Sequence, residues 1–273
     1  MRRRARAFLG LLAAAATGCA GVHRFHPNFY SVDGDIKLGQ AISKEVDQEV
    51  VLLRLSALTQ LVNRVGARLQ ESSREPAFKL FPYSFHVVDD SEVNAFALPG
   101  GPVYINTGII ELCETEDELA AVVGHEMGHV AARHATEMLT TQNLTEFALI
   151  AAVSVIPVPI PPIAWEGTKL AYVLGLLKYS RGKESEADRL GLALMNDAGY
   201  DPTAMAAVFR KLSEQQRSLP SVVERFVSSH PLSEDRMADA ERLAATLPHR
   251  ADAPIVTATS STFSQVKLMF AKD

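Results

Sequence analysis

The stretch His125-Glu126-Met127-Gly128-His129 lies in a proline-free run from Glu116 to Ala135. Thr115, with Glu118 three residues later, is typical of a helix start, so we predict a helix over this run. Two histidines four residues apart lie on one face of a helix and can reach a single metal ion, with Glu126 beside them. The spacing predicts the metal site of a zinc hydrolase.

The apolar residues of the same run favour the helix independently of the histidines. At about 100° per residue they fall on one face, and His125 and His129 fall roughly opposite; this apolar face comprises Leu119, Val123, Met127 and Val130. The histidines therefore lie outside the core stripe. The competing interpretation is that they are ordinary polar residues of the helix.

A catalytic zinc needs a third protein ligand. Positions 132 and 135 are alanines, which excludes a third histidine placed six residues after the second one. His134 points about 140° away from His129 if both lie on one helix, so we do not expect it to be a ligand.

Downstream, the run from Ser180 to Asp188 offers two acidic residues one helical turn apart. We predict Glu184 as the third ligand and Asp188 as a hydrogen-bond partner of a ligand histidine. Glu186 faces roughly the other way on such a helix. The alternative is that this run is a solvated charged face.

Outside these motifs, the sequence predicts a mostly helical α+β fold with a small sheet. Residues 35–70 have helical spacing in two segments, which we expect to pack on the outside of the catalytic core. Residues 83–88, 94–99 and 103–105 read as strands, with a turn at 99–102.

The segment at 94–97 is rich in small residues and precedes a proline, which favours an edge strand close to the active-site cleft. Such an edge can bind an extended peptide as an added strand. The predicted substrate-binding residues are Asn94, Ala95, Phe96 and Ala97.

The first residues resemble a bacterial lipoprotein signal. Four arginines precede a short apolar run at 8–16, and Thr17-Gly18-Cys19 follows it. This organisation predicts a signal peptide at 1–18, lipidation of Cys19, a tether at 19–34, a zinc metallopeptidase domain at 35–247 and a C-terminal tail at 248–273. An ordinary secretory signal with an incidental cysteine is the alternative.

Charge and cysteine content narrow the possible partners. Loss of residues 1–18 would remove four of 27 basic side chains, leaving 23 against 32 acidic ones, a formal charge of −9. This acidity argues against nucleic acid as a partner. Cys113, the one cysteine besides Cys19, is expected to be a small buried residue, and no intrachain disulfide is expected.

The region from Phe147 to Leu177 is apolar and interrupted by four prolines. It falls short of the roughly 18 uninterrupted apolar residues of a membrane span. A lid over the cleft, a surface lying against the membrane and a buried helical hairpin all remain open for it.

These motifs together resemble peptidase family M48, a gluzincin family. The resemblance covers residues 35–245, and it rests on the segment 94–101, on the HExxH stretch and on Ser180-Arg181 followed by Glu184 and Ala187-Asp188. It implies a zincin-like metallopeptidase that binds one Zn²⁺ per chain. Some periplasmic members carry a tetratricopeptide array after the peptidase domain, and this chain is expected to end too soon to hold one.

The resemblance also gives a meaning to Ser229-His230-Pro231 and to Arg236. In similar members, a histidine in an equivalent His-Pro segment approaches the zinc, and an arginine shortly after it faces the cleft. By this analogy His230 is a regulatory ligand or a transition-state donor, and Arg236 stabilises an oxyanion. From the residues alone, His230-Pro231 equally fits a turn before a helix, with Arg236 a surface charge.

The resulting hypothesis is an endopeptidase in which His125, His129 and Glu184 hold zinc and Glu126 is the general base. Its expected substrates are extended or misfolded proteins of the bacterial cell envelope. We expect a periplasm-facing location and a lipid anchor in the outer membrane; the sequence does not define the oligomeric state. The alternatives are a non-proteolytic chaperone or assembly lipoprotein that keeps a structural zinc, and an intramembrane protease, which would need spanning helices.

Overall fold

The computed structural model describes residues 27–54, 56–153, 178–247 and 259–270. The predicted signal peptide, Cys19 and residues 154–177 of the apolar region lie outside these ranges. None of the helices within the described ranges combines the length and the apolar character that crossing a membrane requires.

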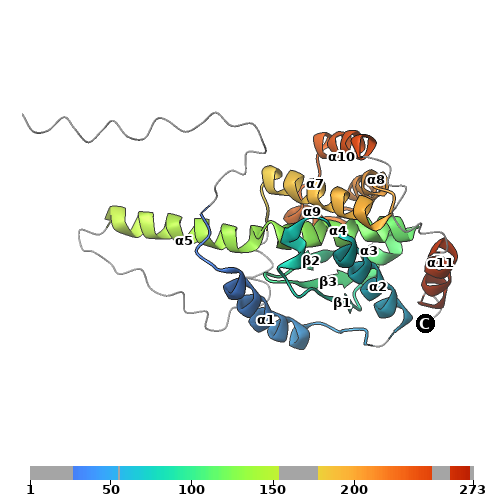
Figure 1. Cartoon of the computed structure of the whole chain (residues 1–273), viewed down its shortest axis with the longest axis horizontal. Helices are drawn as coiled ribbons and strands as arrows, with labels where there is room; N and C mark the ends of the chain where they lie inside the picture. Colours follow the sequence, from blue (N-terminus) through green and yellow to red (C-terminus); the bar gives the residue numbers. More distant parts are fainter. Residues whose placement is uncertain (1–26, 55, 154–177, 248–258, 271–273) are drawn as a thin grey trace, which may run out of the picture.

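The fold is mostly helical with one small sheet, as predicted (Figure 1). The described helices that precede the sheet are α1 (Val32–Glu49), α2 (Ala57–Ser72) and the 3₁₀ helix η1 (Pro76–Lys79). Those that follow it are α3 (Thr107–Leu112), α4 (Glu116–Ala131), α5 (His134–Val153), α7 (Arg181–Ala198), α8 (Ala204–Ser218), α9 (Pro220–Ser229), α10 (Glu234–Thr246) and α11 (Thr259–Phe270).

The sheet contains β1 (Ser84–Val88), β2 (Ala95–Ala97) and β3 (Pro102–Asn106), in the order β1-β3-β2. β1 runs parallel to β3, and β2 pairs antiparallel with β3 in a register that places Phe96 opposite Tyr104. The predicted edge position of the 94–99 segment is confirmed.

The central helix α4 lies between the sheet and α7 (Figure 1). Thr115 caps it by accepting a hydrogen bond from the Glu118 amide, and three acidic residues occupy its first turn, where they complement the helix dipole. The helix is buried on almost all sides, including the face that carries His125 and His129. The histidines are therefore not ordinary solvated residues.

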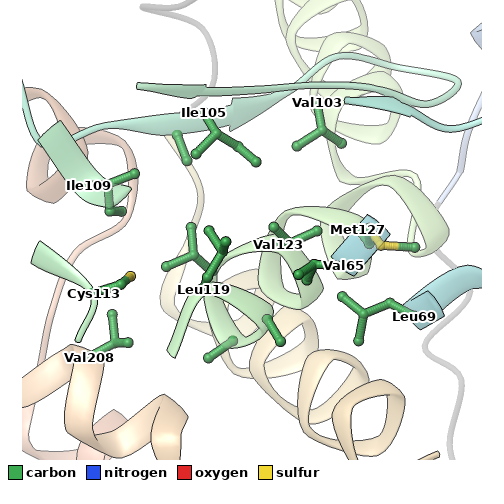
Figure 2. Close-up of a cluster of buried hydrophobic side chains, with 14 of the residues drawn as sticks. Val65, Leu69, Val103, Ile105, Ile109, Cys113, Leu119, Val123, Met127 and Val208 are labelled. Atoms are coloured by element: carbon green, nitrogen blue, oxygen red, sulfur yellow. The ribbon is translucent and has the colours of Figure 1, made fainter. Parts of the chain in front are cut away.

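The main core fills the space between α4, α2 and the sheet (Figure 2). Val65 and Leu69 of α2 pack there beside Val123 and Met127 of α4, and all four are fully buried. The expectation that both early helices lie outside the core is thus wrong for α2, whose apolar face is enclosed by α4, α7 and β1. Cys113 is buried in this core as predicted, and burial raises the pKa of its thiol to about 12.

Both ends of the described chain pack against the body. Before α1, the Phe29 amide donates to Thr140 Oγ1 of α5, and Asn28 bonds Thr136 Oγ1. At the other end, α11 places Phe263 in the main core. The segments predicted as a tether and a tail therefore contain residues that contact the domain.

The predicted long helix ends earlier than expected. α4 stops at Ala131, and Arg133 takes a left-handed conformation with φ of 59° before α5 begins at His134. The Arg133 guanidinium bonds the buried Asp35 carboxylate at 2.6 and 3.1 Å and also the Tyr30 carbonyl. These contacts offset the strain of a non-glycine residue in this region.

Gly128 sets how closely α4 and α7 approach each other. A Cβ added at Gly128 would lie 2.7 Å from the Ala187 carbonyl oxygen and 3.1 Å from its Cα. These are backbone atoms that cannot move without displacing α7.

We expect Gly128→Ala to lower the free energy of unfolding by about 1–3 kcal/mol, because the added methyl group overpacks the contact between the two helices. Denaturant unfolding of the purified protein measures this change.

Gly182→Ala is the matched control, since Gly182 also lies in a helix but is exposed. The atom nearest to a Cβ added at Gly182 would be Ser180 Oγ, at 4.0 Å. Alanine should there leave stability unchanged or raise it by up to about 1 kcal/mol. Equal effects of the two substitutions would contradict the close-contact explanation.

Candidate metal centre

His125 and His129 project from one face of α4 into a buried space. Their Nε2 atoms lie 3.1 Å apart, and both residues are less than 5% exposed. Burial lowers the pKa of His129 well below its ordinary value, which favours the neutral imidazole that binds metals.

Glu184, on the first turn of α7, faces both histidines. Its carboxylate oxygens lie 3.6 Å from His125 Nε2 and 3.4 Å from His129 Nε2. Ser180 caps this helix, and the close approach at Gly128 brings its first turns against α4. Burial alone would raise the pKa of Glu184, but His230, His129 and His125 together hold it far below its usual range.

His230 enters the same space from the C-terminal end of α9. Its Nδ1 atom lies 3.2 Å from Glu184 Oε1 and 3.3 Å from His125 Nε2. Burial would lower the pKa of His230, but Glu184 and Glu126 outweigh it and raise this pKa above its usual value. His230 and Pro231 do precede a helix, α10, yet His230 is only 1% exposed.

Four potential ligand atoms thus converge, from His125, His129, Glu184 and His230, all within 4.8 Å of one another. Imidazole nitrogens and a carboxylate oxygen are ligands that zinc takes in proteins. This set fits a zinc ion in its chemistry, its burial and the convergence of its donors.

Asp188 and Arg236 form a layer behind the ligands. Asp188 Oδ1 lies 2.9 Å from His125 Nδ1, and two 2.8 Å hydrogen bonds join the Arg236 guanidinium to Asp188. Burial would raise the pKa of Asp188, but the contacts with His125 and Arg236 lower it. Asp188 therefore remains a carboxylate that can accept from His125.

Arg236 is 3% exposed, so the interpretation of it as a surface charge is wrong. Besides Asp188, it contacts Glu184 Oε2 at 2.7 Å and the Pro231 carbonyl at 3.0 Å. Its guanidinium is thereby directed at the ligand layer and the His-Pro segment. This arrangement favours a positioning role for Arg236 over the stabilisation of an oxyanion.

Glu126 lies beside the cluster and is 1% exposed. Its Oε1 atom has no hydrogen-bond partner among the described residues, and His230 Nε2 lies 3.6 Å from it. An unpartnered buried carboxylate oxygen is costly, and its position next to the ligands leaves it available to bind a proton.

Sequence reasoning did not find the part played by His134. It lies outside the four-donor cluster, as expected, but the stated reason was wrong, because the break at Arg133 places it on a different helix from His129. Its Nδ1 atom lies 2.9 Å from His129 Nδ1, and its Nε2 atom lies 3.4 Å from Glu186 Oε2. Nothing in the local sequence signals a left-handed arginine.

Tyr179 was missed as well. Its ring stacks on His129 at 4.0 Å between centroids and 20° between planes, and its amide donates to the Ser229 carbonyl beside His230. Burial raises its pKa well above the ordinary value. Tyr179 directly precedes the Ser180 helix cap in the sequence, and this position was the signal that could have identified it.

The β2 strand borders the site. The Asn94 carbonyl accepts a hydrogen bond from the Asn106 amide, and the Leu98 amide donates one to the Pro102 carbonyl. Because residues along an antiparallel strand alternately face the partner strand, the backbone N–H and C=O groups of Ala95 and Ala97 face away from β3. β2 also packs against α4. Phe96 turns its side chain to the opposite face of the sheet and stacks on Tyr104.

A pocket adjoins this strand on the His129 side of the site. Ala97 and Leu98 line it together with His129, Arg133 and Tyr179.

His86, which lies in the strand predicted at 83–88, stacks on Tyr104 and lies outside the donor cluster.

Several curated proteins are similar to this chain. A beta-barrel assembly-enhancing protease of Yersinia pestis is 28% identical over 88% of this chain and 49% of its own length. The protein of that name from Escherichia coli strain K12 is 30% identical, over 78% and 44%. The mitochondrial metalloendopeptidase OMA1 of Schizosaccharomyces pombe is 33% identical, over 77% and 61%.

The chain spans about half the length of the curated relatives it matches. Residues 57–244 match the model of one family, and this range includes each of the four potential metal ligands. Because the match covers more than half of the chain, the chain belongs to peptidase family M48.

Proposed function

We propose that this chain is a zinc-dependent endopeptidase. The observation that carries the proposal is the convergence of His125, His129, Glu184 and His230 beside Glu126, whose carboxylate has a buried oxygen without a hydrogen-bond partner among the described residues. Membership of a peptidase family and the names of two relatives as metalloendopeptidase and protease support it.

His125, His129 and Glu184 would hold the metal. Zinc in such a site lowers the pKa of water toward about 7 and polarises a carbonyl group. Glu126 accepts the proton of the water that attacks the peptide carbonyl and then delivers it to the leaving amine. Its position next to His125 in the sequence and its burial suit this role.

Asp188 and Arg236 keep the ligands in place. Asp188 Oδ1 lies 2.9 Å from His125 Nδ1, so it faces that nitrogen while Nε2 faces the other donors, and Arg236 ties Asp188 to Glu184. Because these contacts are buried, we propose that they restrict the movement of the ligand side chains.

The substrate is proposed to be an extended protein segment that adds to the edge of β2 facing away from β3, where no strand of the described residues pairs. The peptide groups of Ala95 and Ala97 are directed to that edge, and backbone pairing places little demand on sequence. Unfolded polypeptide meets this requirement. Two relatives are named for beta-barrel assembly, and together with the predicted lipidation of Cys19 this favours proteins of the bacterial cell envelope as substrates.

His230 is proposed to hold the enzyme in a latent state. A catalytic zinc site keeps a position open, whereas four protein ligands close it. Since His230 Nδ1 lies as near to Glu184 and His125 as the other donors do, it would fill that position. Activity would then require His230 to move away.

We expect Glu126→Gln to slow the cleavage of casein, an unfolded substrate, by at least about 100-fold, while one zinc per chain is retained. The amide cannot accept the proton, and removal of a general base lowers the rate by about 10²- to 10⁴-fold. Zinc content by elemental analysis and casein hydrolysis measure the two effects on the same preparations.

The control is Glu241→Gln, an identical change at an exposed residue that pairs with Arg210 on the surface. It should alter neither zinc content nor hydrolysis. If Glu126→Gln cleaved casein at the wild-type rate, the assigned role of Glu126 would be wrong.

For His230→Ala we expect faster casein hydrolysis with zinc retained. If the open form of the wild type is a minor conformer, it is populated at roughly 0.1–10%. Removing the blocking side chain opens every chain, so the rate should rise about tenfold or more. Initial rates per zinc-loaded chain provide the measurement.

A loss of activity in His230→Ala would instead assign His230 as a donor during catalysis. If zinc bound but neither wild type nor His230→Ala cleaved casein, the chain would be a zinc-stabilised scaffold, the non-proteolytic alternative.

A further inference from the structure

We propose that His134, oriented by Glu186, is a positioning residue that fixes the ring of the ligand His129. This inference rests on the proposed metal site and concerns two residues outside the donor cluster. It gives a function to a buried histidine and an acidic residue that the proposed reaction does not use.

The contacts form a continuous path from the cluster to the surface. His129 Nε2 faces His125 and Glu184, so its Nδ1 atom is the one left for a supporting bond. His134 Nδ1 lies 2.9 Å from that atom, and His134 Nε2 lies 3.4 Å from Glu186 Oε2. His134 is 1% exposed, whereas the Glu186 side chain is 40% exposed.

The pattern of donors and acceptors assigns the hydrogens. A His129 ring that binds metal through Nε2 carries its hydrogen on Nδ1 and must donate it. His134 Nδ1 then accepts, which leaves the His134 hydrogen on Nε2, directed at the Glu186 carboxylate. Each nitrogen of the two rings thereby has one partner: the metal, the other imidazole or the Glu186 carboxylate.

The two ligand histidines of α4 are thus supported differently. Asp188 contacts His125 directly and is itself held by Arg236, all within the buried interior. His129 relies on a neutral imidazole, and the carboxylate lies one residue further out. Tyr179, stacked on the face of His129, restricts the same ring from a second direction.

Packing alone does not explain His134. An imidazole buried to this extent is costly unless its nitrogens are bonded, and a leucine or phenylalanine would fill the space at lower cost. The break at Arg133 also matters here, because it turns the start of α5 so that His134 faces His129.

The test compares zinc affinity in four variants of the full chain, by competition with a chromophoric chelator. His134→Phe keeps a ring and removes both nitrogens, His134→Asn keeps an acceptor near the position of Nδ1, and Glu186→Gln removes the charge that orients His134. Glu241→Gln is the control, an identical change at an exposed carboxylate of α10 that pairs with Arg210.

We expect His134→Phe to weaken zinc binding by about 10- to 100-fold, the usual effect of removing a supporting partner of a metal ligand. His134→Asn should restore much of the affinity, Glu186→Gln should weaken it by a smaller factor, and Glu241→Gln should leave it unchanged. The unfolding temperature of the metal-free proteins is measured in parallel, so that loss of stability is separated from loss of affinity.

Unchanged zinc affinity in His134→Phe, with or without lower stability of the metal-free protein, would overturn the inference. If the wild type bound no zinc at all, the proposed function itself would fail. Should His134→Phe not fold, the nitrogen resonances of zinc-loaded wild type decide: a hydrogen on His129 Nδ1 and none on His134 Nδ1 supports the assignment, and the reverse contradicts it.

Discussion

The site depends on the contact between α4 and α7. The first helix carries His125, Glu126 and His129, and the second carries Glu184 and Asp188, so their separation fixes the geometry of the cluster. Gly128 lies between the two ligand histidines of α4 and meets the Ala187 backbone. The absence of a side chain there, and at Gly191 of α7, where an added Cβ would lie 3.0 Å from the Gly124 carbonyl carbon, lets the two sets of ligands meet.

Burial of charge is the second constraint. Glu126, Glu184 and Asp188 are buried together, and among the described residues Arg236 is the guanidinium that contacts two of them. Three carboxylates and one guanidinium leave an excess of negative charge that a protein interior does not tolerate uncompensated. A divalent cation bound by the four donors would supply the missing positive charge, so the donor set and the charge balance point to the same kind of ligand.

Much of this site was predictable because its determinants are local. The HExxH spacing, the Thr115 cap and the acidic pair at Glu184 and Asp188 each follow from helix periodicity. What was not predictable depends on tertiary contacts. The left-handed Arg133 is stabilised by Asp35, about a hundred residues away, and this break decides that His134 contacts His129. The central place of α2 likewise depends on which elements enclose its apolar face.

The four donors also differ in how firmly the fold holds them. His125, His129 and Glu184 belong to buried, closely packed helices and are supported by further side chains. His230 instead follows the last residue of α9, a ten-residue helix, and Pro231 comes directly after it. Beside it, a bond from the Tyr179 amide to the Ser229 carbonyl joins this segment to the start of α7. In the latent state proposed above, His230 is the donor that would leave the cluster, because it lies at the end of this short helix, and its departure would expose the metal position and the Oε1 atom of Glu126.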